Sequence, residues 1–395
     1  MRILVAGGGT GGHIYPTLAV VEELEKKGVK DIIYIGSSEG METKVIPQLG
    51  LNYHFVSAGK FRRYHNNLLL NIVDPTTIFK NLIDFFKVIK GFFESRAIIK
   101  EYDPDLVFIK GGYVGLPIGF AAASLNYPII IHESDSILGL ANRILSRFAS
   151  RIMVSYPENY YHDLPRAKVV YTGNPIRKEM LTGSLKEGRE VFELNIKEPV
   201  LLIVGGSQGS HFINSLIAES LSELLKDFQI IHVCGDNDIS WLLYLKSQLE
   251  DDLKNKYKVF SFLSNELRDA FAVSDLVIGR AGQNFISEAS AIGKPMLLIP
   301  LGVSSSAHQF RNAQIVTRFG AAYTLTEDDL SRDVFIRQIK LIFEKPGELA
   351  FLAKKSKEFG KEDASESMAE VIMEYARLNN EEEEKEITKA SRRKK

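Results

Sequence analysis

The chain has 395 residues, of which 45% are hydrophobic, and its 49 basic residues nearly balance its 50 acidic ones. This length and composition suit two domains of ordinary size, and a net charge of −1 gives no reason to expect a nucleic-acid partner. The single cysteine, Cys234, excludes an internal disulfide and a multi-cysteine metal site. The N-terminus does not resemble a signal peptide and no apolar run reaches membrane-spanning length, so we expect a soluble protein or one held peripherally on a membrane.

In the first half of the chain, short β-branched runs alternate with helical patterns. The predicted elements, in order, are a strand at 3–6, a helix from about 15 to 27, and strands at 32–35, 106–109 and 129–132. This alternation is typical of βαβ units, which build a parallel sheet. The first strand runs directly into the glycine-rich turn Gly7–Gly12. We therefore predict a Rossmann-like first domain over residues 1–172.

The second half of the chain repeats this pattern. The predicted elements are a strand at 200–204, a helix from about 214 to 225, and strands at 230–234, 276–278 and 296–299. The first of these strands also ends in a glycine-rich turn, Gly205–Ser210. We predict a second Rossmann-like domain over residues 178–354. A hinge is predicted at 173–177, where a glycine and a proline stand close together.

Beyond the second domain, the sequence predicts two further segments. We expect a C-terminal helix, from about 355 to 378, to pack back on the first domain. Residues 379–395 consist of blocks of like charge with almost no apolar content. This composition is typical of disorder, which we predict for the tail.

His13 stands at the end of the first glycine-rich turn. Such a turn lets the main chain approach a ligand and points N–H groups at an anion. The turn lacks the lysine of a Walker loop, and no acidic residue suited to a nicotinamide ribose follows the next strand. Because an imidazole titrates near neutrality and would lie beside the bound anion, His13 is a candidate catalytic base. The alternative is a polar cap or a surface histidine.

Glu133 and Asp135 follow the strand predicted at 129–132. Both therefore lie at the carboxyl edge of the first sheet, where open α/β sheets bind their ligands. Glu133 could orient His13 or contact an acceptor. Asp135 could equally cap the next helix.

In the second domain, candidate sugar- and nucleotide-binding residues follow the later strands. Glu288 falls within the first two turns of a predicted helix, where its carboxylate could accept hydrogen bonds from vicinal ribose hydroxyls or simply compensate the helix dipole. Gln309 and Asn312 are three residues apart and so share one helix face. Their neutral amides suit sugar hydroxyls because each offers both a donor and an acceptor.

Two pairs of aspartates have the spacing that a divalent cation holding a diphosphate would need, namely Asp103 with Asp105 and Asp236 with Asp238. Both pairs lie in segments next to strands, where solvated aspartates are common. We therefore expect no metal site.

The stretch from Phe61 to Lys100 combines apolar and aromatic residues with a basic fringe that includes Arg62, Arg63, Lys80, Lys87 and Lys90. This pattern fits a protein that rests on an anionic membrane surface. The alternative is that most of these aromatic residues belong to the core.

Taken together, several motifs resemble those of the glycosyltransferases of family 28 that form the second lipid intermediate of peptidoglycan. The motifs are Gly8-Gly9-Thr10-Gly11-Gly12-His13, Gly111-Gly112-Tyr113-Val114, His132-Glu133, Gly173-Asn174-Pro175-Ile176-Arg177, Gly205-Gly206-Ser207-Gln208-Gly209, and Gln309 with Asn312. The resemblance extends from residue 1 to about 375. It implies the GT-B fold, an α/β architecture in which two Rossmann-like, doubly wound domains face their parallel sheets across a cleft.

The resemblance also implies a role for individual residues. Thr10, Gly11 and Gly12 would line the site near the diphosphates, with His13 as the favoured base, Glu133 as the alternative base and Tyr113 facing the lipid-linked acceptor. In the second domain, the resemblance implies that Arg177 and Ser207 hold the nucleotide diphosphate, the main chain of Leu263 reads the uracil, Glu288 binds the ribose, and Gln309 and Asn312 hold the sugar.

Two departures from the family pattern concern the sugar contacts. Many members have Gln-Asn where this chain has Ser134-Asp135, and they often have two glutamines where it has His308-Gln309. The first departure leaves it open whether Asp135 replaces the usual amide contact to the sugar.

The implied reaction is an inverting, metal-free transfer of N-acetylglucosamine from UDP-N-acetylglucosamine to the 4-hydroxyl of undecaprenyl-linked muramyl-pentapeptide. The implied location is peripheral, on the cytoplasmic face of the bacterial membrane. Three alternatives remain open: a UDP-N-acetylglucosamine 2-epimerase, a GT-B transferase for another lipid acceptor such as diacylglycerol, and a non-catalytic binding or scaffold protein.

Overall fold

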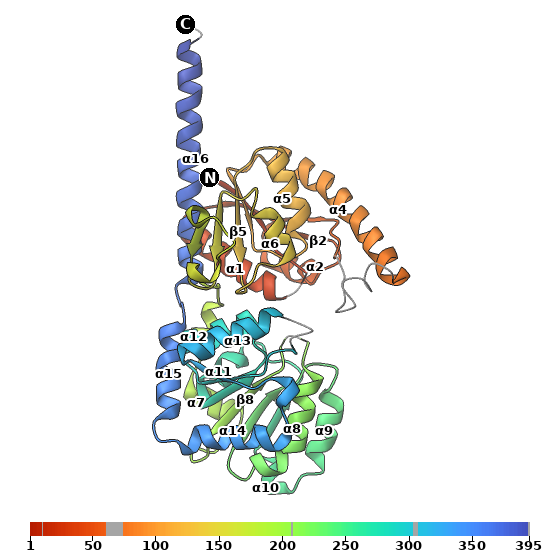
Figure 1. Ribbon diagram of the computed structural model, residues 1–395, viewed down its shortest axis with the longest axis vertical. Helices are drawn as coiled ribbons and strands as arrows, with labels where there is room; N and C mark the ends of the chain where they lie inside the picture. The colour runs from red at the N-terminus through yellow and green to blue at the C-terminus, as the bar shows by residue number, and fades with distance from the viewer. Residues whose placement is uncertain (10, 61–73, 207, 303–306, 394–395) are drawn as a thin grey trace. The chain divides into compact units, whose positions relative to one another are not determined.

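The computed structural model describes residues 1–9, 11–60, 74–206, 208–302 and 307–393, with the main chain alone from residue 379 onward. The chain divides into two compact units (Figure 1). Residues 1–175 and 363–395 form the first unit, and residues 176–362 form the second. The division falls inside the segment 173–177, and the hinge predicted there stays a prediction.

The first unit contains a parallel sheet of seven strands in the order β3-β2-β1-β4-β5-β6-β7. The strands are β1 (Arg2–Ala6), β2 (Asp31–Ser37), β3 (Asn52–Val56), β4 (Leu106–Ile109), β5 (Ile129–Glu133), β6 (Arg151–Val154) and β7 (Val169–Tyr171). The α-helices are α1 (Gly11–Lys26), α2 (Glu42–Val45), α4 (Pro75–Tyr102), α5 (Gly115–Ser124), α6 (Leu140–Leu145) and α16 (Ala364–Arg393). Short 3₁₀ turns η1 (Ile46–Leu49), η2 (Glu158–Tyr160) and η3 (Arg166–Lys168) complete the unit.

The core of the first unit follows from the apolar strands, whose side chains alternate between the two sheet faces. On one face, Ile3 and Val5 of β1 pack with the apolar sides of α1 and α16. These two helices, from opposite ends of the chain, lie side by side (Figure 1). Other helices cover the opposite face of this sheet. One of them, α5, contacts the strands β4 and β5 and the helices α4 and α6.

The second unit contains a parallel sheet of six strands in the order β10-β9-β8-β11-β12-β13. The strands are β8 (Val200–Val204), β9 (Gln229–Val233), β10 (Tyr257–Phe260), β11 (Leu276–Gly279), β12 (Met296–Leu298) and β13 (Ala322–Thr324). The α-helices are α7 (Leu185–Val191), α8 (His211–Leu224), α9 (Ile239–Ser247), α10 (Asp251–Lys254), α11 (Glu266–Val273), α12 (Gln283–Ile292), α13 (Ala307–Phe319), α14 (Arg332–Glu344) and α15 (Glu348–Phe359), with 3₁₀ turns η4 (Lys178–Thr182) and η5 (Glu327–Asp329).

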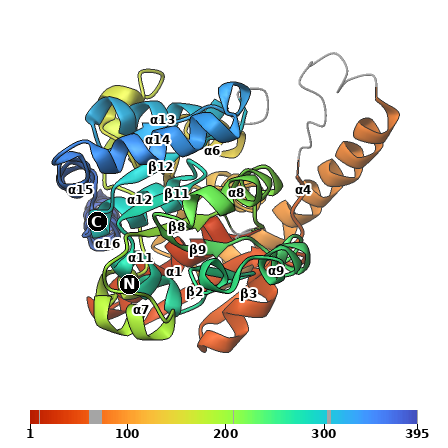
Figure 2. The same cartoon turned by 90° about the horizontal axis from the view of Figure 1, so that it is seen from below.

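Helices cover both faces of the second sheet (Figure 2). Leu201 and Ile203 of β8 point toward a core shared with α8, α9 and α14. Val200 and Leu202 point to the other side, into a core shared with α11, α12 and α13. This doubly covered parallel sheet is the architecture that the alternating pattern predicted, and the α/β fold class is confirmed in both units.

Two segments of the structure differ from their prediction. The helix expected from about 355 to 378 is divided at Gly360: α15 packs against α12 in the second unit, and only α16 packs on α1 in the first. The tail expected to be disordered continues α16 as far as Arg393. Its composition gives the physical reason, because glutamate, lysine and alanine favour helix and no proline or glycine interrupts the segment.

Candidate functional site

The order of the strands in the first sheet brings two loops together at one edge of that sheet. The chain leaves β1 toward β2 on one side and later returns to β4 on the other, so the sheet order reverses between β1 and β4. The loops that follow these two strands diverge there and form the crevice in which open α/β sheets bind ligands. The glycine-rich turn follows β1, and Gly111-Gly112-Tyr113 follows β4.

The glycine-rich turn is held by a buried carboxylate that the sequence analysis missed. Glu42 of α2 accepts a hydrogen bond from the main-chain N–H of Gly9 at 2.9 Å and another from Ser37 at 2.8 Å. Gly9 has a φ of +88°, and a Cβ there would overlap the ring of Tyr113. Glycine is therefore required at this position, both by the backbone conformation and by the close packing of Tyr113.

Tyr113, predicted to face the acceptor, lies at this turn and carries the Lys60 ammonium 4.8 Å from its ring centroid. Gly11 and Gly12 are the first residues of α1, which begins four residues earlier than predicted. They therefore contribute a helix N-terminus rather than a loop. Thr10 lies outside the described residues.

His13 lies in the first turn of α1, with its ring against the loop after β4. A Cβ on Gly112 would stand 3.2 Å from His13 Nε2, so the absent side chain of Gly112 makes room for the imidazole. Nδ1 is buried and has no hydrogen-bond partner in the described structure. Loss of hydration, followed by the nearby charge of Lys110, lowers the pKa of His13 to about 4. His13 was expected to titrate near neutrality, and burial overturns that expectation.

Glu133 ends β5 and anchors the loop that follows it. One carboxylate oxygen accepts the N–H of Asp135 at 3.1 Å, and the other accepts Gly139 N–H at 2.9 Å and Asn142 Nδ2 at 3.0 Å. Burial and the nearby Asp135 raise the pKa of Glu133, while these three donors oppose the rise. No hydrogen bond joins Glu133 to His13 among the described side chains, so the structure does not bring the two candidate bases into direct contact.

Lys110 is a second residue that the sequence analysis missed. It follows the last residue of β4 and is 1% exposed. Its Nζ donates to Ser134 Oγ at 2.5 Å and to Asn174 Oδ1 at 3.2 Å. A lysine that ends a four-residue apolar run, directly before two glycines, was the signal available in the sequence.

In the second unit, the sheet order reverses between β8 and β11, so the turn at 205–210 occupies the same topological position as the first glycine-rich turn. Arg280, directly after β11, holds the loops together. Its guanidinium donates to Ser210 Oγ at 2.7 Å and to the carbonyl oxygens of Ile299 and Pro300, and it pairs with Glu327 at 2.6 Å. Ser207, predicted to hold the diphosphate, lies outside the described residues.

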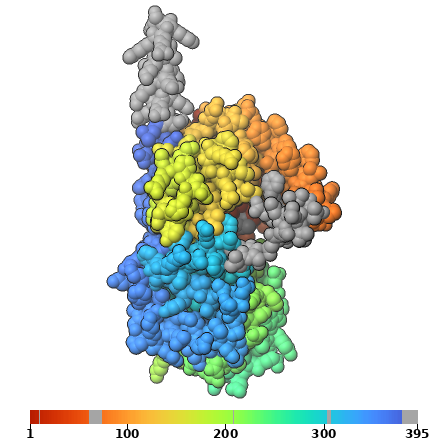
Figure 3. All heavy atoms as spheres, viewed as in Figure 1, coloured from red at the N-terminus to blue at the C-terminus, as the bar shows by residue number. Residues whose placement is uncertain are grey.

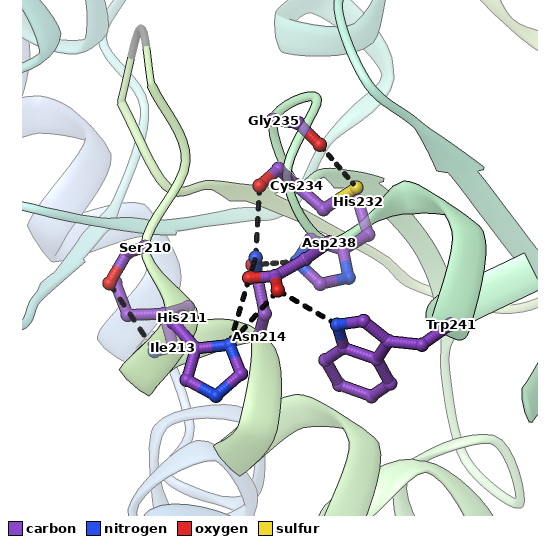
Figure 4. Close-up of polar contacts among 9 residues, drawn as sticks. All are labelled: Ser210, His211, Ile213, Asn214, His232, Cys234, Gly235, Asp238 and Trp241. Carbon is purple, nitrogen blue, oxygen red and sulfur yellow. Dashed lines mark hydrogen bonds and ion pairs between the residues drawn. The ribbon is translucent and has the colours of Figure 1, made fainter.

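Figure 4 shows a polar cluster beside this turn. Asp238 is buried, and its carboxylate receives His211 Nδ1 at 2.9 Å, Asn214 Nδ2 at 2.7 Å and Trp241 Nε1 at 2.8 Å. Asn214 also accepts a hydrogen bond from His232, which is buried in the sheet. The carboxylate of Asp238 is thus occupied by N–H donors.

Asp103 and Asp105, also considered as metal ligands, are engaged in a similar way. Asp103 accepts hydrogen bonds from Arg2 and from Tyr127, both at 2.8 Å, and Asp105 accepts the main-chain N–H of Arg2 at 2.7 Å. The described residues contain no group of three or more His, Cys, Asp or Glu side chains placed to hold a metal. The expectation of a metal-free site stays a prediction.

Arg177 and Glu288, predicted to bind the diphosphate and the ribose, contact each other. Glu288 Oε1 accepts hydrogen bonds from Arg177 Nη2 at 3.1 Å and from Arg177 Nε at 3.3 Å. Burial raises the pKa of Glu288, and the charge of Arg177 opposes this rise. Because Arg177 donates to only one oxygen of the Glu288 carboxylate, it orients that carboxylate while the other oxygen can accept hydrogen bonds from hydroxyl groups.

The remaining predicted residues of the second unit lie at the carboxyl ends of its strands. The Leu263 side chain is buried in the core, so that its main chain is the part available to a ligand. The side-chain oxygen of Gln309 accepts a hydrogen bond from the main-chain N–H of Leu301 at 3.1 Å. Asn312 is fully buried and donates to the Ala281 carbonyl at 3.3 Å. Both amides therefore brace loops.

Helix α4 buries mainly small and polar residues, together with Val88 and Ile99, and leaves most of its large apolar residues exposed. The buried positions include Thr77, Asp84, Gly91 and Ser95. The exposed apolar side chains of α4 are Ile78, Phe79, Leu82, Ile83, Phe85, Phe86, Ile89 and Phe93. The helix lies on the surface of the first unit (Figure 3).

An apolar face of this size on a helix marks an interaction surface. The alternative that most of these aromatic residues are core is wrong for Phe79, Phe86 and Phe93, which are each more than 60% exposed. The predicted patch residues 61–73 lie outside the described part of the chain. None of the described helices is long and apolar enough to cross a membrane.

Comparison with known proteins extends over both units. Residues 3–154 match the glycosyltransferase family 28 N-terminal domain, and residues 200–368 match its C-terminal domain. A protein of Lachnospira eligens, named UDP-N-acetylglucosamine–N-acetylmuramyl-(pentapeptide) pyrophosphoryl-undecaprenol N-acetylglucosamine transferase, is 39% identical over 345 residues, which cover 87% of this chain and 91% of the relative.

Among solved structures, the crystal structure of Acinetobacter baumannii MurG matches with a TM-score of 0.72 and 25% identity, covering 95% of this chain and all of that one. A UDP-GlcNAc 2-epimerase from Neisseria meningitidis matches with a TM-score of 0.66 over 95% of this chain and 100% of its own, but at 17% identity this likeness concerns the fold alone. The matched family domains and the identity to the L. eligens transferase lead to one conclusion: this chain belongs to glycosyltransferase family 28 and is a glycosyltransferase.

Proposed function

We propose that the chain transfers N-acetylglucosamine from UDP-N-acetylglucosamine to the 4-hydroxyl of undecaprenyl-pyrophosphoryl-N-acetylmuramyl-pentapeptide, with inversion, in peptidoglycan biosynthesis. The family and the name of the L. eligens relative support this donor and this acceptor. The observation that carries the chemistry is His13, an imidazole at the point where the first sheet reverses its order, with a buried Nδ1 that has no hydrogen-bond partner in the described structure.

In this reaction His13 accepts the proton of the acceptor hydroxyl while the hydroxyl oxygen attacks the anomeric carbon of N-acetylglucosamine. The bond from that carbon to the diphosphate oxygen breaks, and UDP leaves with the electron pair. Because its pKa is about 4, His13 is neutral at physiological pH and its lone pair is free. A base this weak takes the proton only as the attacking hydroxyl becomes acidic in the transition state.

Glu133 fits an anchoring role better than that of the base. Its two oxygens already accept three N–H donors from the loop between β5 and α6. A carboxylate that gave up these bonds to accept a proton would leave buried donors unsatisfied, at a cost of about 1–3 kcal/mol each. Asp135 lies in the loop that Glu133 anchors, and we propose that its side chain faces the acceptor.

We propose that the donor binds the second unit. Ser207 and Arg177 would hold the diphosphate, Leu263 the uracil, and Glu288 the ribose through the oxygen that Arg177 leaves free. Gln309 and Asn312 would hold the sugar. The guanidinium and the N-termini of helices would stabilise the charge on the leaving diphosphate, so no metal cofactor is needed.

We propose a peripheral location on the cytoplasmic face of the bacterial membrane, reached through α4. Its exposed apolar side chains would enter the interface, and Lys80, Lys87 and Lys90 on the same helix would attract anionic headgroups. Replacing Phe79, Phe86 and Phe93 together by serine should reduce binding to vesicles that contain anionic lipid. Transfer to a water-soluble acceptor analogue should stay unchanged, and a loss of both would contradict a purely membrane-binding role.

The transfer assay combines the protein, labelled UDP-N-acetylglucosamine and the lipid-linked muramyl-pentapeptide. We expect transfer to persist with chelator and to fall about 10²- to 10⁴-fold in His13→Gln, the usual contribution of a general base. Glu133→Gln, the matched variant at the alternative base, should retain far more activity. No transfer to this acceptor would refute the proposal, and epimerised sugar from donor alone would favour the epimerase.

A further inference from the structure

Arg280 and Glu327 form an ion pair at the carboxyl edge of the second sheet. Arg280 directly follows β11, and Glu327 begins the turn η5 after β13. Arg280 Nη1 lies 2.6 Å from Glu327 Oε1, and Arg280 is only 9% exposed. Because the lost hydration of two buried charges offsets most of their attraction, such a pair contributes little to stability. Its significance lies in the main chain that it holds.

The pair holds the loop that follows β12. Arg280 Nη1 donates to the carbonyl oxygen of Ile299 at 3.2 Å and to that of Pro300 at 3.3 Å. The second carboxylate oxygen of Glu327, Oε2, accepts the main-chain N–H of Gly302 at 3.0 Å. The loop is therefore fixed through two of its carbonyl groups by the guanidinium and through one of its N–H groups by the carboxylate.

This loop in turn orients the side-chain amide of Gln309. Leu301 lies inside the held loop, and its main-chain N–H donates to Gln309 Oε1 at 3.1 Å. Because a main-chain N–H can only donate, the oxygen of the amide faces the loop and the NH₂ group faces away from it. Within the described part of the chain, Nε2 of Gln309 has no hydrogen-bond partner. The amide thus carries an available donor with a fixed direction.

Arg280 also reaches the turn on the other side of β11. Its Nη2 donates to Ser210 Oγ at 2.7 Å, at the end of the glycine-rich turn after β8. The order of the sheet reverses between β8 and β11, which is where open α/β sheets bind their ligands. One guanidinium therefore connects the loops after β8 and β12. Since Glu327 compensates its charge, Arg280 suits a brace between these loops better than a ligand for phosphate.

We propose that Arg280 and Glu327 are positioning residues of the donor site. They fix the loop after β12, and the Leu301 N–H of that loop turns the Gln309 amide so that Nε2 donates a hydrogen bond to an oxygen of the donor's sugar. The inference rests on the proposed function, in which Gln309 holds N-acetylglucosamine. Neither Arg280 nor Glu327 needs to touch the donor.

The test compares the affinities for UDP-N-acetylglucosamine and for UDP, measured by calorimetry. Glu327→Gln keeps the size of the side chain, but its NH₂ group must face either Arg280 or the Gly302 N–H, which are both donors. In this variant we expect the affinity for UDP-N-acetylglucosamine to fall about 5- to 10-fold, as the loss of one hydrogen bond allows. The affinity for UDP, which lacks the sugar, should stay near the wild-type value, so the ratio of the two affinities should fall.

A double variant tests whether Glu327 acts through Gln309. Gln309→Ala removes the amide and should by itself lower the affinity for UDP-N-acetylglucosamine. Adding Glu327→Gln should then cause no further loss, because two changes that act through one contact are not additive. The matched control is Glu348→Gln: Glu348 is also buried, pairs with Lys345 at 2.6 Å and accepts the hydroxyl of Tyr323 at 2.6 Å. It should leave both affinities unchanged.

Arg280→Lys provides a second variant that keeps the charge. Its single nitrogen cannot hold Ser210 and the loop after β12 at once, so the ratio of the two affinities should fall here as well. Thermal melting establishes that each variant is folded.

The outcomes separate this inference from the function on which it rests. If the wild-type protein binds the donor and the ratio of affinities is unchanged in the folded variants of Glu327 and Arg280, the inference is wrong and the proposed function stands. A further loss in the double variant would also overturn it, because Glu327 would then act by a route other than Gln309. Absence of donor binding by the wild-type protein would contradict the proposed function itself, and the inference with it.

Discussion

Replacing Glu42 tests whether one buried carboxylate shapes the first glycine-rich turn. Glu42 is fully buried, and each of its oxygens accepts one main-chain N–H, from Gly9 and from Ser37. Glu42→Gln keeps the shape of the side chain but turns an NH₂ group toward one of these donors. Glu42→Ala removes both acceptors.

The expected loss of stability follows from the two hydrogen bonds that Glu42 accepts. Each main-chain N–H left buried and unsatisfied costs about 1–3 kcal/mol, so Glu42→Ala should lower the free energy of unfolding of the first unit by about 2–6 kcal/mol. Glu42→Gln loses one of the two bonds and should cost about half as much. A domain is stable by only about 5–15 kcal/mol, so the alanine variant approaches the limit of folding.

The single tryptophan provides an internal reference for this measurement. Trp241 lies in the second unit, so its fluorescence during urea unfolding reports that unit alone. Hydrogen exchange read by mass spectrometry over residues 1–56 reports the first unit. We expect faster exchange there in Glu42→Gln, with the tryptophan transition unchanged. The control is Glu22→Gln. The exposed carboxylate of Glu22 on α1 pairs with Lys26, and its replacement should cost less than about 0.5 kcal/mol.

Kinetics extend the test to function. If the turn positions His13, Glu42→Gln should lower kcat while the KM for the donor, assigned to the second unit, stays near the wild-type value. Wild-type exchange around Gly9 in folded Glu42→Ala would refute the anchoring role. A change confined to the donor KM would refute the assignment of this turn to the acceptor side.

Three further predictions concern other parts of the chain. Since burial raises the pKa of Glu288 and its ionised form would accept the ribose hydroxyls, UDP affinity measured by calorimetry should fall as the pH is lowered through that pKa, and Glu288→Gln should bind weakly at every pH. Asp238→Asn sets an NH₂ group against the donors from His211 and Asn214, so urea unfolding followed by tryptophan fluorescence should show a loss of about 1–3 kcal/mol in the second unit. Gly91→Ala would place its Cβ onto the Ser57 carbonyl, and a lower Tm and faster exchange in α4 should report the displaced helix; unchanged exchange would contradict this packing.

The sequence predicted the elements whose local pattern is strong. The strands at 106–109 and 200–204 have the predicted bounds because each is a continuous apolar run that ends at a sharp polar or glycine boundary. The strand β3 was not predicted, since three of its five residues are exposed and its pattern does not alternate. The start of α1 was placed too late because two glycines are poor helix formers, and packing overrides that preference.

The sequence predicted where the site lies but not which side chains contact one another there. His13 was found from its place after a glycine-rich turn, a local signal. Its low pKa and the role of Glu42 could not be foreseen, because they depend on how the chain packs: Glu42 reaches back to Gly9, 33 residues earlier, and the loop after β4 reaches His13 because β1 pairs with β4. Burial, not residue type, decides the charge of an imidazole.

The two units place a cation at the same topological position, and the difference between them separates their chemistry. Lys110 directly follows β4 and Arg280 directly follows β11, the strands that flank each first strand at its point of reversal. The charge of Arg280 is compensated by Glu327 at 2.6 Å, and the guanidinium braces the loops. Lys110 Nζ instead donates to two neutral oxygens, those of Ser134 and Asn174. In the proposed function, the cation held by an ion pair therefore belongs to the unit that would bind the donor, and the cation with neutral partners belongs to the unit that would bind the acceptor.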